Sequence, residues 1–262
     1  MEKIGDIKNE YKEITSCGIM DYEKEKSLLI SFIDKYVEDE RSGVIKILES
    51  AEKRINAIDK ETSRVMDMMS FERKYYSETD FIAGVDEVGR GPLAGPIVTA
   101  AVVLPKDMII PFVNDSKQIN EKKREELYDI ILENAVSYCI GIRSEKEIDE
   151  IGIGVCDSLA MKDAVLGLKV TPGVVLVDAF KIPDLDIKQV PIIKGDTKSI
   201  SIAAASIVAK VYRDRLMDEM DKKYPEYGFA SNKGYGSAKH IEAIKTIGPC
   251  EIHRRSFIKN FV

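Results

Sequence analysis

Two adjacent carboxylates, Asp86 and Glu87, are the residues whose types and spacing point most directly to chemistry. They follow an apolar stretch and precede a turn rich in glycine and proline that contains Gly89, Arg90 and Gly91. The glycines permit backbone angles that other residues resist, and the Arg90 guanidinium offers a fork of donors suited to phosphate. A carboxylate pair beside a phosphate-facing turn suggests metal-assisted chemistry on a phosphodiester.

The position of this pair raises a geometric question. Residues 81–87 are predicted to form a buried strand that the glycine and proline cluster ends. Successive side chains on a regular strand point to opposite faces of the sheet. We therefore expect Asp86 and Glu87 to aim into one pocket only if Glu87 already belongs to the turn.

Two further carboxylates lie at comparable places in the chain. Asp178 ends the apolar run 174–178, which is typical of a central strand buried on both faces, and Asp196 precedes a helix of small residues. In open α/β sheets, ligands bind beyond the carboxyl ends of the strands. Four acids gathered there would repel one another, and Mg²⁺ or Mn²⁺ would relieve the repulsion. With two such ions, one can generate hydroxide while the other stabilises the leaving oxygen.

The elements that must position these acids alternate from residue 81 onward. Strands are predicted at 81–87, 97–104, 136–142, 174–178 and 190–193, and helices at 121–135, 155–168 and 201–210. Ser116 or Asn120 is the expected cap of the first of these helices, and the first two strands should pair antiparallel. The pattern predicts an α/β fold with a mixed sheet flanked by helices.

Residues 1–74 have a different pattern. Apolar residues recur at helical spacing over 29–37 and again over 44–58, with Ser42-Gly43 between the two stretches. We expect two amphipathic helices in an N-terminal extension and a catalytic domain over 75–262. A helical cap or partner-binding appendage is favoured over nucleic-acid binding, because the segment has more acidic than basic side chains.

Composition narrows the class of protein. The 262 residues contain no apolar run long enough to cross a membrane and no visible signal peptide. The four cysteines are scattered without a Cys-x-x-Cys pair, so neither a disulfide framework nor a zinc site is expected, and the cytoplasm is the expected location. The net charge of −6 argues weakly against a nucleic-acid partner, but residues 201–262 are locally basic.

A set of motifs in order along residues 80–257 resembles the ribonuclease HII family. The motifs are Gly84-Val-Asp-Glu-Val-Gly-Arg-Gly-Pro-Leu-Ala-Gly-Pro96, Asp115-Ser-Lys117, Val177-Asp178, Lys194-Gly-Asp-Thr-Lys-Ser199, Tyr227-Gly-Phe229, Lys233-Gly-Tyr-Gly236 and His253-Arg-Arg-Ser-Phe257. Ala179 stands where the family frequently has glycine, and local repacking is expected there. The similar ribonuclease HIII family has glutamate at the fourth acidic position, so Asp196 favours the HII type.

The resemblance implies a ribonuclease H-like fold and an endonuclease that cleaves the RNA strand of RNA–DNA hybrids. It also implies incision of duplex DNA on the 5′ side of a single embedded ribonucleotide, leaving 3′-hydroxyl and 5′-phosphate ends. The implied site residues follow from the matching motifs. Asp86, Glu87, Asp178 and Asp196 would bind Mn²⁺ or Mg²⁺; Gly89, Arg90 and Gly91 would grip the backbone at the ribonucleotide; Tyr235 would stack on the following sugar; and Lys117 and Lys194 would contact phosphates.

Other interpretations remain open from the residues themselves. A monomer is expected. The acids could serve a metal-dependent phosphatase or phosphotransferase, although the basic C-terminal part argues against a small substrate. A ribonuclease HIII-like nuclease is a second alternative, and a non-catalytic hybrid-binding module is a third, although such a module has no need of four acids. His240 and His253 are expected to be structural rather than metal ligands or a general base.

Overall fold

The computed structural model describes residues 2–262, and the chain divides into two compact units. The first comprises the residues up to Asp67 together with Ile109–Phe112, and the second comprises Met68–Met108 and Val113–Val262. The structural division thus lies at Met68, whereas the composition change in the sequence suggested residue 75.

The first unit is built from helices. These are α1 (Ile4–Ile14), the 3₁₀ turn η1 (Ile19–Asp21), α2 (Tyr22–Tyr36) and α3 (Ser42–Met68). Their apolar stripes meet in one cluster that includes Ile7, Leu29, Phe32 and Val44. The two predicted helices are present, and α3 begins at Ser42 itself. Helix α1 was not predicted, although Ile7 and Ile14 lie on its apolar face.

The second unit contains a five-stranded mixed sheet in the order β3-β2-β1-β4-β5. Its strands are β1 (Ile82–Val88), β2 (Ile97–Val103), β3 (Ser137–Arg143), β4 (Val174–Asp178) and β5 (Lys188–Ile192). Strands β1, β2 and β3 pair antiparallel, whereas β4 and β5 run parallel to β1. The predicted antiparallel pairing of the first two strands is confirmed, and so is the mixed sheet.

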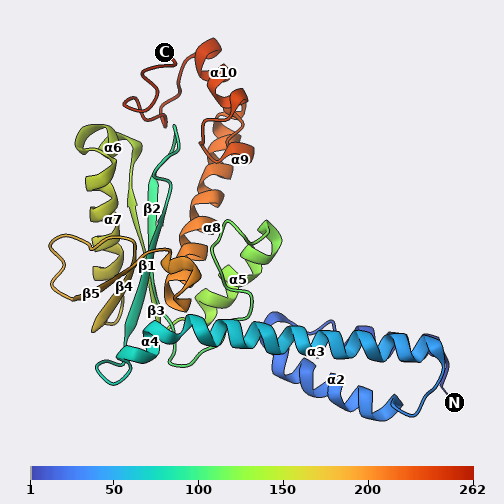
Figure 1. Ribbon diagram of the computed structural model, residues 1–262. Helices are drawn as coiled ribbons and strands as arrows, with labels where there is room; N and C mark the ends of the chain where they lie inside the picture. The colour runs from blue at the N-terminus through green and yellow to red at the C-terminus, as the bar shows by residue number, and fades with distance from the viewer. Residues whose placement is uncertain (1) are drawn as a thin grey trace. The chain divides into compact units, whose positions relative to one another are not determined.

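Helices cover both faces of this sheet (Figure 1). One face packs against α7 (Ile153–Leu166), which α6 (Glu145–Ile151) adjoins; the other packs against α8 (Ile200–Lys223), which α5 (Glu121–Asn134) contacts. Ala83 and Val85 of β1 join the core on the α7 face. Gly84 faces α8 so closely that a Cβ there would lie 2.0 Å from the Ser201 carbonyl carbon. The small residues of α8 therefore allow it to pack directly on the central strand.

The chain ends in short elements beyond α8. They are η3 (Pro225–Tyr227), α9 (Phe229–Asn232) and α10 (Ala238–Ile247), with η2 (Gly195–Thr197) preceding α8. Asn120 caps α5, as expected, by accepting a hydrogen bond from the Lys123 main-chain N–H. None of the helices in the described part of the chain is both long and apolar enough to span a bilayer.

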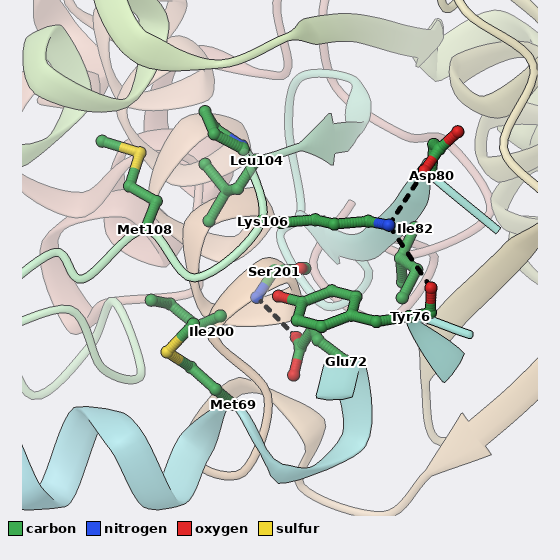
Figure 2. A pocket seen from close by; sticks show the side chains of 11 residues that line it. Met69, Glu72, Tyr76, Asp80, Ile82, Leu104, Lys106, Met108, Ile200 and Ser201 are labelled. Atoms are coloured by element: carbon green, nitrogen blue, oxygen red, sulfur yellow. Dashed lines mark hydrogen bonds and ion pairs between the residues drawn. The ribbon is translucent and has the colours of Figure 1, made fainter. Parts of the chain in front are cut away.

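A buried glutamate of the short helix α4 (Ser70–Tyr75) anchors the start of α8 (Figure 2). Glu72 Oε1 accepts hydrogen bonds from the Ser199 hydroxyl at 2.5 Å and from the Ser201 N–H at 3.0 Å. Its other oxygen has no protein partner among the described residues, and burial raises the pKa of this carboxyl. The carboxylate lies where a helix N-terminus favours negative charge, so α4 stabilises the α8 N-terminus.

Candidate active site

The two neighbouring acids of β1 lie on opposite faces of the sheet. Both belong to the strand, which continues to Val88 before the turn begins. Asp86 is buried on the α8 side, where hydrogen bonding by Ser206 opposes the rise of its pKa. Glu87 lines a cavity of about 300 Å³ with residues of α7. The condition that Glu87 belong to the turn is therefore not met, and ordinary strand alternation holds.

Asp178 is the acid that the others share as a neighbour. It ends β4, the parallel strand beside β1, and its Oδ1 accepts a hydrogen bond from the Gly195 N–H at 2.7 Å. It lines the same cavity as Glu87. Because β1 and β4 run parallel, their carboxyl ends meet at one edge of the sheet, which brings Asp178 near both acids of β1.

Burial and neighbouring charges raise the pKa values of these acids. Burial raises the pKa of Asp86 well above its usual value, and the charges of Glu87 and Asp178 add to the rise. Burial also raises the pKa of Glu87 to about 7, with contributions from the charges of Asp157 and Asp178. Each acid thus disfavours ionisation of its neighbours.

Asp196 joins this group from η2, just ahead of α8. Burial raises its pKa, and the charges of Asp115 and Asp178 raise it further, whereas the charge of Lys117 lowers it. The motif containing Lys117 therefore lies near the fourth acid. Lys194, which precedes the turn, is exposed and has a left-handed backbone with φ of 56°.

The donor atoms of the four acids suit hard divalent cations. All four acids supply carboxylate oxygens, the ligands that Mg²⁺ and Mn²⁺ prefer. Across residues 2–262, no three His, Cys, Asp or Glu side chains already surround one point closely enough to hold an ion. Mg²⁺ usually takes only one or two carboxylates, with waters and substrate phosphates as its other ligands. The four acids therefore suit ions whose remaining ligands are waters and substrate phosphates better than ions coordinated by protein side chains alone.

The predicted substrate residues Gly89, Gly91 and Tyr235 come together beside the acids. Gly89 has φ of +97°, and a Cβ there would lie 2.4 Å from Arg213 Nε, so only glycine fits. A Cβ on Gly91 would be 4.0 Å from the Tyr235 ring, which places the turn and the aromatic side by side. The Tyr235 residue is 40% exposed, so its ring remains accessible to a ligand.

A fifth carboxylate, Asp157, was missed by the sequence analysis. It projects from α7 into the cavity that Glu87 lines, and its Oδ2 lies 3.1 Å from Arg90 Nη1. Its Oδ1 is buried and has no hydrogen-bond partner among residues 2–262, and burial raises the pKa of the Asp157 carboxyl to about 6. Asp157 occupies the buried stripe of α7 that also contains Met161 and Ala164. An acid at an apolar position of a helix was the signal that could have revealed it.

Ala179 follows Asp178 and lines the same cavity. Its φ is +58°, in the left-handed region that residues with a Cβ adopt only at a cost of roughly 1 kcal/mol. The departure from glycine noted in the sequence therefore lies at a strained position within the site.

The two histidines are buried and hydrogen-bonded to each other, with 3.0 Å between their Nε2 atoms. His240 Nδ1 donates to the Tyr235 carbonyl at 2.8 Å. The neutral ring therefore has no hydrogen on Nε2, which accepts the hydrogen bond donated by His253 Nε2–H. His253 Nδ1 in turn accepts from the Cys250 N–H at 3.0 Å. Burial lowers the pKa of both rings, that of His253 to about 4. This arrangement supports the structural role expected for them.

Comparison with known proteins agrees with this geometry. The family model described as Ribonuclease HII matches residues 83–260, and the model described as Ribonuclease HII N-terminal domain matches residues 3–76. The ribonuclease HII of Lachnoclostridium phytofermentans is 57% identical over 87% of this chain and 89% of its own. The ribonuclease HII of Acetivibrio thermocellus is 53% identical over 84% of this chain and 86% of its own.

Solved structures show the same fold. The ribonuclease H2 from Pyrococcus horikoshii is similar with a TM-score of 0.59 and 29% identity, covering 69% of this chain and 96% of that one. A ribonuclease HIII bound to Mn²⁺ has a TM-score of 0.53 at 21% identity, covering 64% of this chain and 63% of that one, which supports the fold alone. The chain belongs to the ribonuclease HII family and is a metal-dependent endoribonuclease.

Proposed function

We propose that this ribonuclease cleaves the RNA strand of RNA–DNA hybrids and incises duplex DNA on the 5′ side of a single embedded ribonucleotide. The products would carry 3′-hydroxyl and 5′-phosphate ends. One observation carries the proposal: Asp178 of β4 lies near Asp86 and Glu87 of β1 and near Asp196 of η2, so that its charge raises the pKa of all three acids. Beside these acids lie Gly91 and the accessible Tyr235 ring.

In this proposal, Asp86, Glu87, Asp178 and Asp196 hold Mg²⁺ or Mn²⁺. Such ions would supply an activated water at neutral pH and would stabilise charge on the leaving oxygen. The protein's own part is positioning. The Gly195 N–H fixes the orientation of the Asp178 carboxylate, and burial of Asp86 limits its freedom. Lys117, whose charge acts on Asp196, is available for a substrate phosphate.

Recognition of the ribonucleotide is assigned to the turn and the tyrosine. A 2′-hydroxyl distinguishes RNA from DNA. Because Gly89 and Gly91 have no side chains, the peptide groups on either side of Arg90 can approach that hydroxyl closely. Tyr235 then stacks on the sugar that follows the ribonucleotide. Lys194, exposed just before Asp196, is a further phosphate contact in this scheme.

The test is cleavage of a labelled duplex DNA that contains one ribonucleotide, alongside a uniform RNA–DNA hybrid. Each substrate is incubated with Mg²⁺, with Mn²⁺ and with a chelator. We expect metal-dependent incision directly 5′ of the ribonucleotide and internal cuts in the hybrid's RNA strand. Incision on the 3′ side, or no incision with either metal, would contradict the proposal.

An Asp178→Asn variant separates catalysis from binding. Asparagine retains the shape of the side chain but removes the charge that acts on the three other acids. We expect cleavage to fall by at least about a hundredfold, the scale seen when electrostatic stabilisation is lost, with hybrid binding retained. The exposed Asp186→Asn is the matched control, and its cleavage should stay at the wild-type level. Equal activity of the Asp178 variant would rule out the assigned role.

A further inference from the structure

Two completely buried arginines lie beneath the Gly89–Pro96 loop. Arg213 comes from α8 and Arg254 from the C-terminal segment, and the exposed fraction of each residue is 0%. They direct six hydrogen bonds of 2.6–3.1 Å at main-chain carbonyls. Arg254 donates to the carbonyls of Gly89, Arg90 and Gly95, and Arg213 donates to those of Ala94, Pro96 and Lys233.

This arrangement sorts the polar groups of the loop by direction. The carbonyls named above turn inward to the guanidinium groups. The main-chain N–H groups of Arg90 and Gly91, in contrast, have no protein acceptor within residues 2–262. These two N–H groups therefore remain available to a ligand, whereas the carbonyls of Gly89 and Arg90 are occupied.

The charge of the two guanidinium groups is not neutralised locally. Neither Arg213 nor Arg254 forms an ion pair with a carboxylate in the described part of the chain. Burial of such groups is costly, and it lowers the pKa of Arg254 to about 9, with the charge of Arg213 adding to the effect. The carbonyl dipoles offset part of this cost.

The same arginines connect the loop to the segment that carries Tyr235. Arg213 bonds both the loop and the Lys233 carbonyl, and its guanidinium carbon lies 5.9 Å from the centroid of the Tyr235 ring. The Leu93 N–H donates to the Gly234 carbonyl at 2.8 Å, and the Arg254 N–H donates to the Leu93 carbonyl at 2.9 Å. The loop and the Tyr235 turn are therefore one connected structure with a fixed separation.

We propose that Arg213 and Arg254 are positioning residues that fix the distance between the Gly89–Gly91 turn and Tyr235. The inference rests on the proposed function, because it concerns the two elements that hold the substrate there. It adds two residues that touch no substrate and act through the carbonyls they hold.

The test compares Arg254→Lys with Arg255→Lys in the full-length protein. Lysine retains the charge but cannot make three hydrogen bonds in the geometry of a guanidinium fork. Arg255 is the adjacent exposed arginine, so its variant is the matched control. We expect Arg254→Lys to raise KM for the single-ribonucleotide duplex by about tenfold while kcat changes less than about threefold, the pattern of lost substrate positioning. Arg255→Lys should remain within about twofold of the wild type in both constants.

Arg213→Lys provides an independent second variant, because it removes the other half of the same set of bonds. If both residues act through one loop, their effects on KM should not add. The double variant should then have a KM only slightly higher than that of the more strongly affected single variant. Thermal unfolding checks that each variant is folded at the assay temperature. An unchanged KM in folded Arg254→Lys and Arg213→Lys, or a loss confined to kcat, would overturn the inference.

Failure of the proposed function gives a different result. If wild-type protein cleaves neither substrate, the equilibrium binding of the same duplex is measured by fluorescence anisotropy in chelator. Weaker binding by the Arg254 and Arg213 variants than by Arg255→Lys would still support the positioning of the turn and Tyr235 by the two arginines. Equal binding by all four proteins would overturn it.

Discussion

Arg90 Nη1 lies 3.1 Å from Asp157 Oδ2, so the arginine of the glycine-rich turn is held by a buried acid of α7. The Arg90 side chain is 46% exposed, whereas the Asp157 side chain is only 8% exposed. A buried, shape-fixed partner restricts the directions in which Arg90 can present its remaining donors. Asp157 therefore lies between two predicted parts of the site, the acids and the phosphate-facing turn.

Asp157→Asn should weaken substrate binding through Arg90. The amide retains the shape but not the charge, so we expect KM to rise by roughly three- to tenfold, the scale of a lost charge-assisted hydrogen bond. A double-mutant cycle with Arg90→Lys checks the route, because residues that act through one ion pair are not additive. Strictly additive losses in kcat/KM would show that Asp157 acts elsewhere.

The stability of the metal-free protein should fall as pH rises. Burial raises the pKa of Asp157 to about 6 and that of Glu87 to about 7, above their usual 3.8 and 4.5. A carboxyl with a raised folded-state pKa contributes stability that is present below its unfolded-state pKa and lost as pH rises through the folded-state value. The thermal midpoint in chelator should therefore decrease between about pH 4 and pH 8 from these groups.

Glu87→Gln isolates one of these contributions. The amide cannot ionise, so the variant should be more stable than the wild type at pH 8 by on the order of 1–3 kcal/mol and nearly equal to it at pH 4. Thermal or urea unfolding at the two pH values provides the comparison. A variant that is destabilised more at pH 8 than at pH 4 would have the wrong sign.

Divalent ions should reverse the loss of stability at pH 8. Ligands that bind only the folded state raise its apparent stability, and cations relieve the repulsion among the acids. Millimolar Mg²⁺ or Mn²⁺ should raise the thermal midpoint of the wild type and raise that of Asp178→Asn distinctly less. Titration of the midpoint against metal concentration measures this, and identical curves would exclude Asp178 from the binding of the ions.

The contact between β1 and α8 should tolerate no added atom. Gly84→Ala would place a Cβ 2.0 Å from the Ser201 carbonyl carbon, so we expect at least about 3 kcal/mol of destabilisation or loss of folding. Gly154→Ala is the matched control, because its Cβ would meet nothing within 4 Å in α7. The control should be neutral or slightly stabilising, since alanine favours helices more than glycine does. Comparable unfolding midpoints for the two variants would contradict this packing argument.

Tyr235 should contribute through its ring rather than its hydroxyl. Tyr235→Phe retains the aromatic face, whereas Tyr235→Ala removes it, and stacking is worth about 1–3 kcal/mol per base. We expect kcat/KM to fall roughly five- to 150-fold for alanine and to change little for phenylalanine. The two substitutions would have similar effects if the hydroxyl were the important group.

The sequence was informative where chemistry and periodicity coincide. The strands that end at Asp178 and near Glu87 were predicted, because apolar runs followed by acids and glycines are strong local signals. The contributions of Arg213, Arg254 and Asp157 were not, since they depend on partners far away in the chain. Helix α8 extends to Lys223, whereas the prediction ended at residue 210. The prediction was too short because the run of small residues stops there and the later turns mix apolar with charged residues.

The attachment of Glu72 to the start of α8 has a practical consequence for anyone who wishes to dissect this enzyme. The two family models meet between residues 76 and 83, which invites a cut there to obtain the nuclease part alone. A fragment that starts between these residues would lack Glu72, which accepts the hydrogen bonds from Ser199 and Ser201. The N-terminus of α8, which follows Asp196, would then lose this stabilisation. A fragment that keeps this anchor has to include α4, which lies within the segment matched by the N-terminal family model.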